Sequence, residues 1–151
     1  MKNYKMAIKL FLVGYLIATI VGFATYYINI SLMWITLFTL MPAVFGYLFY
    51  SYLKKTKCGI SETFKETNRL VILWIILSFL LDALVYVLIV PIIYRHKSNW
   101  TFFIDQSPWI WLNYMTLLIL GHFSRFIYHK KLNNPHDQKP NIKETSLSYG
   151  K

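Results

Sequence analysis

No Asp, Glu, Lys or Arg occurs between Leu10 and Leu53, a run of 44 residues. A helix on a water-soluble protein needs a polar face toward water, so a soluble domain of this size cannot accommodate so long an apolar run. A bilayer can, because 44 helical residues extend roughly 66 Å, close to two crossings of a hydrocarbon core about 30 Å thick. The composition agrees, since 56% of the residues are hydrophobic and 15% are charged. We therefore expect an integral membrane protein.

Four apolar segments are long enough to cross a membrane as helices. They cover approximately residues 7–28, 32–53, 70–94 and 109–128. The predicted fold is all-α, a polytopic bundle of four transmembrane helices within residues 1–129. Residues 130–151 form a basic tail whose polar composition predicts disorder. Before the third span, Thr63 and Glu66 fit a capping box at a helix start, and Ile60–Ser61 is a second candidate start.

The basic residues predict the orientation of the four spans. Fourteen of the 16 Lys and Arg lie on one side of the four spans, in residues 1–9, in the segment 54–69 and from Arg125 onward, and only Arg95 and Lys97 lie on the other. Because cytoplasmic loops are enriched in Lys and Arg, both termini and the tail are expected in the cytoplasm. High Lys and Asn with only three Arg is typical of AT-rich bacterial genomes, so we expect a bacterial cytoplasmic membrane. The cations flank apolar segments instead of forming a face on a soluble module, so no nucleic-acid partner is expected despite the net charge of +10.

Asp82 is the one acidic residue inside a predicted span. A charged Asp near the middle of a membrane helix costs roughly 2.5–3.5 kcal/mol on insertion scales, so such residues tend to face the protein interior. Ser78 and Tyr86 lie one turn to either side on the same helix face and form a polar stripe with Asp82. The sequence favours a structural hydrogen bond between helices for this stripe. Proton or ion handling, and a catalytic or ligand-binding role, stay open as alternatives.

The fourth span contains candidate partners for this stripe. Asn113, Thr116 and Ser124 follow helical spacing along one face. We expect that face to pack against Asp82, because a polar group in lipid has no water as an alternative partner. His122 projects from another side of the same span and is interpreted as a hydrogen-bond donor between helices.

Gly14, Ala18 and Gly22 form a stripe of small residues at four-residue spacing in the first span. Small side chains let two membrane helices approach closely, so the stripe predicts a packing surface. Its partner stays open: the second span, the fourth span or a second copy of the protein.

No motif in the sequence indicates a particular chemistry. Gly-rich nucleotide loops, the serine-hydrolase motif and the zinc-protease motif are missing, and Cys58 is the only cysteine. We therefore expect no cofactor and no metal site. The expected partners are the lipid bilayer and either another membrane protein or a second copy of the chain.

Three functions fit these observations. A non-enzymatic accessory or interaction protein is favoured, because no catalytic motif occurs and a basic cytoplasmic face can bind anionic lipid or an acidic partner. A small proton-coupled transporter using Asp82 is the alternative. An intramembrane enzyme using Asp82 with His122 has the least support, because no nucleophile accompanies them. The surroundings of Asp82 distinguish the first two: a cavity favours transport, and a dry helix contact favours a structural role.

Overall fold

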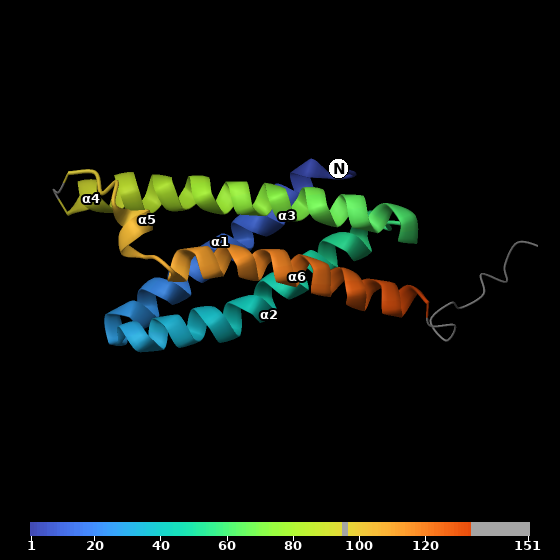
Figure 1. Ribbon diagram of the computed structural model, residues 1–151, viewed down its shortest axis with the longest axis horizontal. Coiled ribbons are helices and arrows are strands. Elements are labelled where there is room, and N and C mark those ends of the chain that lie inside the picture. The colour runs from blue at the N-terminus through green and yellow to red at the C-terminus, as the bar shows by residue number, and fades with distance from the viewer. Residues whose placement is uncertain (95–96, 134–151) are drawn as a thin grey trace, which may run out of the picture.

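The computed structural model describes residues 1–94 and 97–133, and every regular element in these ranges is a helix. Three helical runs are long and apolar enough to cross a membrane. They are α1 (Tyr4–Ile28), α2 (Ile30–Thr56) and the run formed by α3 (Ile60–Asp82), η1 (Ala83–Ile89) and α4 (Val90–Ile93). The short α5 (Phe102–Asp105) leads to α6 (Trp109–Leu132), which is 24 residues long but less apolar (Figure 1).

The outward-facing side chains of these helices are largely apolar. Leu16 and Ile20 on α1, Ile72 on α3 and Ile119 on α6 each expose more than half of their surface. Exposed apolar patches of this extent are unfavourable in water but are solvated by lipid chains. The surface is that of a membrane protein, as the uncharged run in the sequence predicts.

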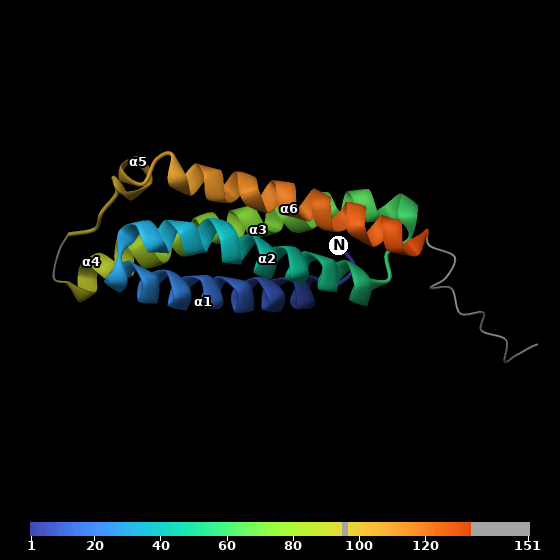
Figure 2. The same cartoon turned by 90° about the horizontal axis from the view of Figure 1, so that it is seen from below.

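The long helices pack in a fixed order around the bundle. α1 lies along α2, α2 also lies along α6, and α6 lies along α3 (Figures 1 and 2). α1 diverges from α3 toward one end, where α4 and the turn between α1 and α2 are well separated in Figure 1. Long side chains still meet across this gap, since the Tyr27 and Tyr94 hydroxyls are 3.5 Å apart. The bundle is therefore closed at one end and splayed at the other.

An aromatic core closes the bundle. We use this name for Phe11, Phe45, Phe49 and Trp74, which come from α1, α2 and α3. The Trp74 indole is fully buried, and its ring centroid lies 4.1 Å from that of Phe49. Its Nε1 donates a hydrogen bond to the Ala7 carbonyl at 3.2 Å, so α3 is fixed to the beginning of α1.

The closed end also gathers the basic side chains, and we call it the basic end. The beginnings of α1 and α3 and the final turns of α2 and α6 lie there (Figure 1). Their cations include Lys5, Lys54, Lys65 and Lys130. The opposite, splayed end holds the turn at Asn29 and the segment between α4 and α6, and we call it the loop end.

The start of α3 corrects one sequence prediction. The helix begins at Ile60 after Gly59, which is the second of the two candidate starts. The Thr63 hydroxyl donates to the Gly59 carbonyl at 2.6 Å, so the predicted capping box does not form. Glu66 is buried, and its Oε1 accepts hydrogen bonds from the Tyr52 hydroxyl at 2.6 Å and from the Lys2 backbone N–H at 2.7 Å. The polar segment 54–69 between the second and third spans is therefore mostly helical.

The small-residue stripe of α1 packs on α2. A Cβ added to Gly14 would lie 2.7 Å from Leu48 Cδ1, and one added to Gly22 would lie 3.9 Å from Leu37 Cδ2. Ala18 packs against the buried core between them. Of the three partners that the sequence left open, the structure shows the second span at this stripe.

The third span contains a π-helix, η1, that the sequence did not predict, and α4 with Pro91 follows it. Pro91 has no N–H and cannot bond to the carbonyl one turn before it, which is that of Val87. The Asn99 N–H donates to this carbonyl at 3.1 Å, so the segment after α4 folds back onto the helix. At the other terminus, α6 continues to Leu132, past the predicted limit of the span, and residues 134–151 of the predicted tail lie outside the described residues.

Candidate functional site

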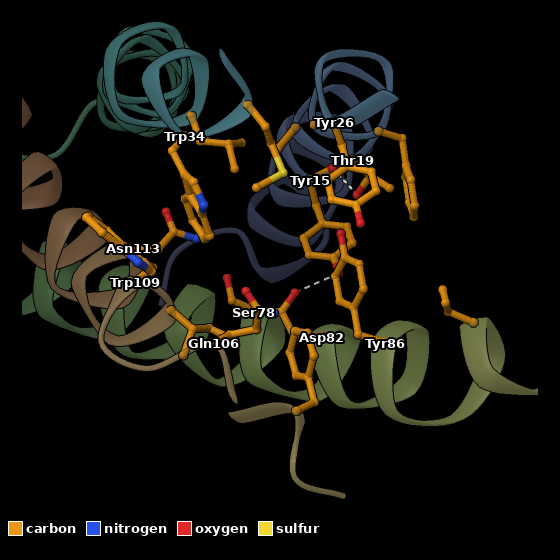
Figure 3. A pocket seen from close by; sticks show the side chains of 18 of the residues that line it. Tyr15, Thr19, Tyr26, Trp34, Ser78, Asp82, Tyr86, Gln106, Trp109 and Asn113 are labelled. Carbon is orange, nitrogen blue, oxygen red and sulfur yellow. Dashed lines mark hydrogen bonds between the residues drawn. The ribbon is translucent and has the colours of Figure 1, made fainter. Parts of the chain in front are cut away.

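A cavity of about 860 Å³ lies between the helices in the splayed half of the bundle (Figure 3). Its walls come from α1, α2, α3, η1, α4 and α6, and from the segment that connects α4 to α6. Exposed Lys97, Ser98 and Asn99 line it at the loop end. Small-molecule sites in proteins typically measure about 300–1,000 Å³, so the cavity has the size of such a site.

Asp82 lies on the floor of this cavity, the part toward the basic end that Ser78, Phe45 and Leu117 also line. It is the last residue of α3, and only 8% of its surface is exposed. Its Oδ1 accepts a hydrogen bond from the Tyr15 hydroxyl of α1 at 2.9 Å, and its Oδ2 accepts one from the Tyr114 hydroxyl of α6 at 2.8 Å. The carboxyl group thus joins three helices and also lines the cavity.

The polar stripe of the third span faces the cavity. Ser78, Asp82 and Tyr86 all line it, and Figure 3 shows them opposite Tyr15 and Thr19 of α1. The π-helix η1 begins directly after Asp82, and π-helical segments are frequent at functional sites because they reposition side chains. The structure therefore contains a feature for each interpretation of the stripe. The hydrogen bonds of Asp82 to two other helices fit a structural role, and its position in the cavity lining fits a functional role.

The hydrogen-bond partners predicted for Asp82 on the fourth span are wrong. Asn113 lines the cavity, but the neighbouring Tyr114 makes the hydrogen bond to Asp82. Thr116 donates to the Leu112 carbonyl of its own helix at 2.8 Å, and Ser124 donates to the Gly46 carbonyl of α2 at 3.0 Å. The structure therefore does not bring Thr116 and Ser124 together with Asp82.

His122 lies in a different part of the bundle. Its ring centroid is 6.2 Å from that of Phe64, and the Arg125 guanidinium lies 4.8 Å from the Phe64 centroid in a cation–π contact. Phe64 precedes Asp82 by 18 residues on one continuous helix, which is about 27 Å along the axis. His122 and Asp82 therefore lie too far apart to share one site, and the structure does not support an enzyme that uses both residues together.

Tyr15 and Tyr114 are the functional candidates that sequence reasoning missed. Both lie inside predicted spans, 7–28 and 109–128, and not among the tyrosines at span ends that are typical of membrane interfaces. Their position along the predicted spans, at about the same membrane depth as the Asp82 carboxyl, is the signal that would have identified them. A tyrosine hydroxyl that is shielded from water needs a hydrogen-bond acceptor, and Asp82 is the acid available there.

Two groups of stacked aromatic rings form opposite walls of the cavity. The first wall is Trp34 and Phe38 of α2 with Trp109 of α6, where the Trp34 and Trp109 centroids are 5.4 Å apart.

The second wall is Phe23 of α1, Tyr86 of η1 and Phe102 of α5, where the Tyr86 and Phe102 centroids are 5.1 Å apart. Toward the basic end, Phe45 lines the cavity and packs on Trp74 of the aromatic core, at 6.0 Å between centroids. The arrangement suits a ligand with an apolar body and one polar group directed at Asp82.

No protein-family model, curated protein or solved structure matches this chain.

Proposed function

We propose that this chain is a small membrane transporter that binds its substrate in the cavity above Asp82 and couples transport to proton exchange at Asp82. The observation that carries the proposal is the position of the Asp82 carboxyl on the floor of a cavity that reaches the loop end. Acidic residues within membrane spans commonly mark ion or proton pathways, and pockets of this size commonly hold small molecules. A purely structural carboxyl needs its hydrogen bonds to Tyr15 and Tyr114 but needs no cavity.

Four spans with both termini in the cytoplasm are part of this proposal. With 24 residues, α6 extends about 36 Å, which is enough to cross a bilayer core of about 30 Å. The basic end supports a cytoplasmic position for the beginnings of α1 and α3 and for the ends of α2 and α6. The cavity then opens toward the outer side of a bacterial cytoplasmic membrane.

Reporter fusions test this topology. Fusions after Lys54 and after Lys131 are expected to report a cytoplasmic position, and a fusion after Ser98 an external one. The measurement is the activity ratio of a reporter that is active only in the cytoplasm to one that is active only outside. An external signal at Lys131 would contradict four spans, because an even number of spans returns the chain to its starting side.

The closed end of the bundle gives the transport cycle a direction. The aromatic core lies between the cavity floor and the basic end, so the cavity is closed toward the proposed cytoplasmic side. Alternating access requires one group of helices to move against the other around a fixed site. In our proposal, this structure is the outward-open state, and the hydrogen bonds of Asp82 to Tyr15 and Tyr114 are the contacts that proton exchange would rearrange.

Cysteine labelling tests whether the cavity contains water. In a Cys58→Ser background, Thr19→Cys places a thiol in the cavity, and Ile20→Cys places one on the adjacent outward-facing surface. Only a thiolate reacts with maleimides, and a thiol in lipid does not ionise. In vesicles, N-ethylmaleimide is expected to modify Thr19→Cys about tenfold faster or more than Ile20→Cys. Equal rates, or an unreactive Thr19→Cys, would refute a water-filled cavity.

The accessory or interaction function that the sequence favoured stays a prediction. Its support is the lack of a catalytic motif and the basic end. A dry cavity in the labelling experiment, together with a membrane protein that co-purifies from mild detergent, would favour it over transport.

A further inference from the structure

We infer that the ligand of this cavity is an organic cation with an apolar body. The inference rests on the proposed binding function and adds the chemical class of the substrate. It combines two features of the cavity: a carboxyl on the floor without a basic partner, and two facing walls of aromatic rings.

The Asp82 carboxyl has no cationic partner among the described residues. Its two hydrogen-bond donors, Tyr15 and Tyr114, are neutral phenols. Both ion pairs in the described part of the chain lie at the basic end, where Glu62 pairs with Lys2 and Glu66 pairs with the N-terminal amino group. Among the described lining residues, Lys97 is the one cation, and it is exposed at the loop end. A cationic ligand would therefore supply the countercharge that a carboxylate needs in a membrane interior.

The aromatic walls add a second attraction for a cation. A cation within about 6 Å of a ring centroid is attracted by the negative face of the ring, most strongly for Trp. Trp34 and Trp109 stack on one side of the cavity, and Tyr86 stacks with Phe102 on the other. The same rings provide apolar surface for the body of the ligand, so charge and body are recognised together.

Other ligand classes fit this cavity less well. A metal ion such as Ca²⁺ takes six to eight oxygen ligands, and no group of three His, Cys, Asp or Glu able to hold a metal occurs among the described residues. An anion would face Asp82 without a cation on the floor to bind it. A neutral apolar molecule would leave the carboxyl without a new partner and would gain nothing from its charge.

A competition experiment with two ions of equal size and opposite charge tests the inference. Tetraphenylphosphonium and tetraphenylborate carry the same four phenyl groups around a positive and a negative centre. Each is added to full-length protein carrying Cys58→Ser and Thr19→Cys in lipid nanodiscs, and the rate of modification by N-ethylmaleimide is measured. Tetraphenylphosphonium is expected to slow the modification saturably, by about tenfold or more, and tetraphenylborate to have little effect.

Two acid variants identify the residue responsible. Asp82→Asn is expected to weaken protection by tetraphenylphosphonium about tenfold or more, because it removes the charge and keeps the shape. Asp105→Asn is the matched control, since Asp105 is in α5 outside the cavity lining and bonds to the Thr101 hydroxyl at 2.7 Å. It should leave protection unchanged.

The outcomes separate this inference from the proposed function. If Thr19→Cys reacts but both ions protect it equally, or neither does, the cation inference is wrong and the water-filled cavity stands. Full protection in Asp82→Asn would likewise overturn the inference. If Thr19→Cys does not react at all, the proposed cavity function itself fails.

Discussion

Gly121→Ala is expected to destabilise the bundle by about 1–3 kcal/mol, although alanine favours helices over glycine. A Cβ at Gly121 would overlap the Val71 Cγ2 atom of α3 and would lie 3.5 Å from Phe49 Cε1 of α2. Valine in a helix has essentially one side-chain rotamer, so Val71 cannot turn away and α6 must shift instead. At Gly14, in contrast, the nearest atom is the end of the flexible Leu48 side chain. The free energy of unfolding in a dodecyl sulfate titration measures the loss.

Gly22→Ala is the matched control for this prediction. Gly22 also lies in a long helix, but its added Cβ would meet only Leu37 Cδ2 at 3.9 Å, an ordinary contact. Its stability should change by less than about 0.5 kcal/mol. The double variant Gly121→Ala, Val71→Ala removes the overlapping methyl group and should lose less stability than the sum of the two single variants. Equal stabilities for Gly121→Ala and Gly22→Ala would show that the α3–α6 contact is looser than described.

The helix content of this chain could be predicted from the positions of its charges. The predicted spans 7–28 and 32–53 match α1 and α2 to within three residues at each end. Charges mark only the outer limits of this pair, where a membrane helix meets water, because the turn at Asn29 lies in an uncharged segment. Charge positions alone do not locate the start of α3, which lies inside a polar segment at Ile60, the second of the two helix starts that the sequence offered. Glu66 is buried because Tyr52, 14 residues away, reaches its carboxyl group, and such a long-range contact leaves no periodic signal.

The candidate site could be predicted only in part. Spacing along one helix identified Ser78, Asp82 and Tyr86 as one face, and all three line the cavity. The donors to Asp82 come from Tyr15 and Tyr114, on helices whose rotation about their own axes a single sequence does not determine. The cavity itself depends on the divergence of α1 from α3 toward the loop end, which is a property of packing and not of any one segment.

Asp82→Asn is expected to abolish function while the fold stays intact. An amide keeps an acceptor oxygen for one tyrosine hydroxyl and adds an NH₂ group that can donate to the other, so both Tyr15 and Tyr114 can stay bonded. It cannot exchange a proton near neutral pH, so a cycle that uses Asp82 as its proton carrier would stop. The measurements are folded yield, rescue of the phenotype of a strain lacking the gene, and the carboxyl band in pH-difference infrared spectra, which should be lost in the variant.

Asp82→Leu separates this functional loss from a structural one. Leucine leaves the hydroxyls of Tyr15 and Tyr114 without their acceptor, and hydrogen bonds between membrane helices contribute about 0.6 kcal/mol on average and up to about 1.7 kcal/mol. Its folded yield and stability should therefore fall, whereas those of Asp82→Asn should match the parent protein. If Asp82→Asn rescues the phenotype fully and only Asp82→Leu fails, Asp82 is a structural link between helices, and the transporter proposal is wrong. A well-folded but inactive Asp82→Asn shows that function needs the Asp82 carboxyl group itself, as proton carrier or as countercharge to the ligand, because the helix contacts are then preserved without function.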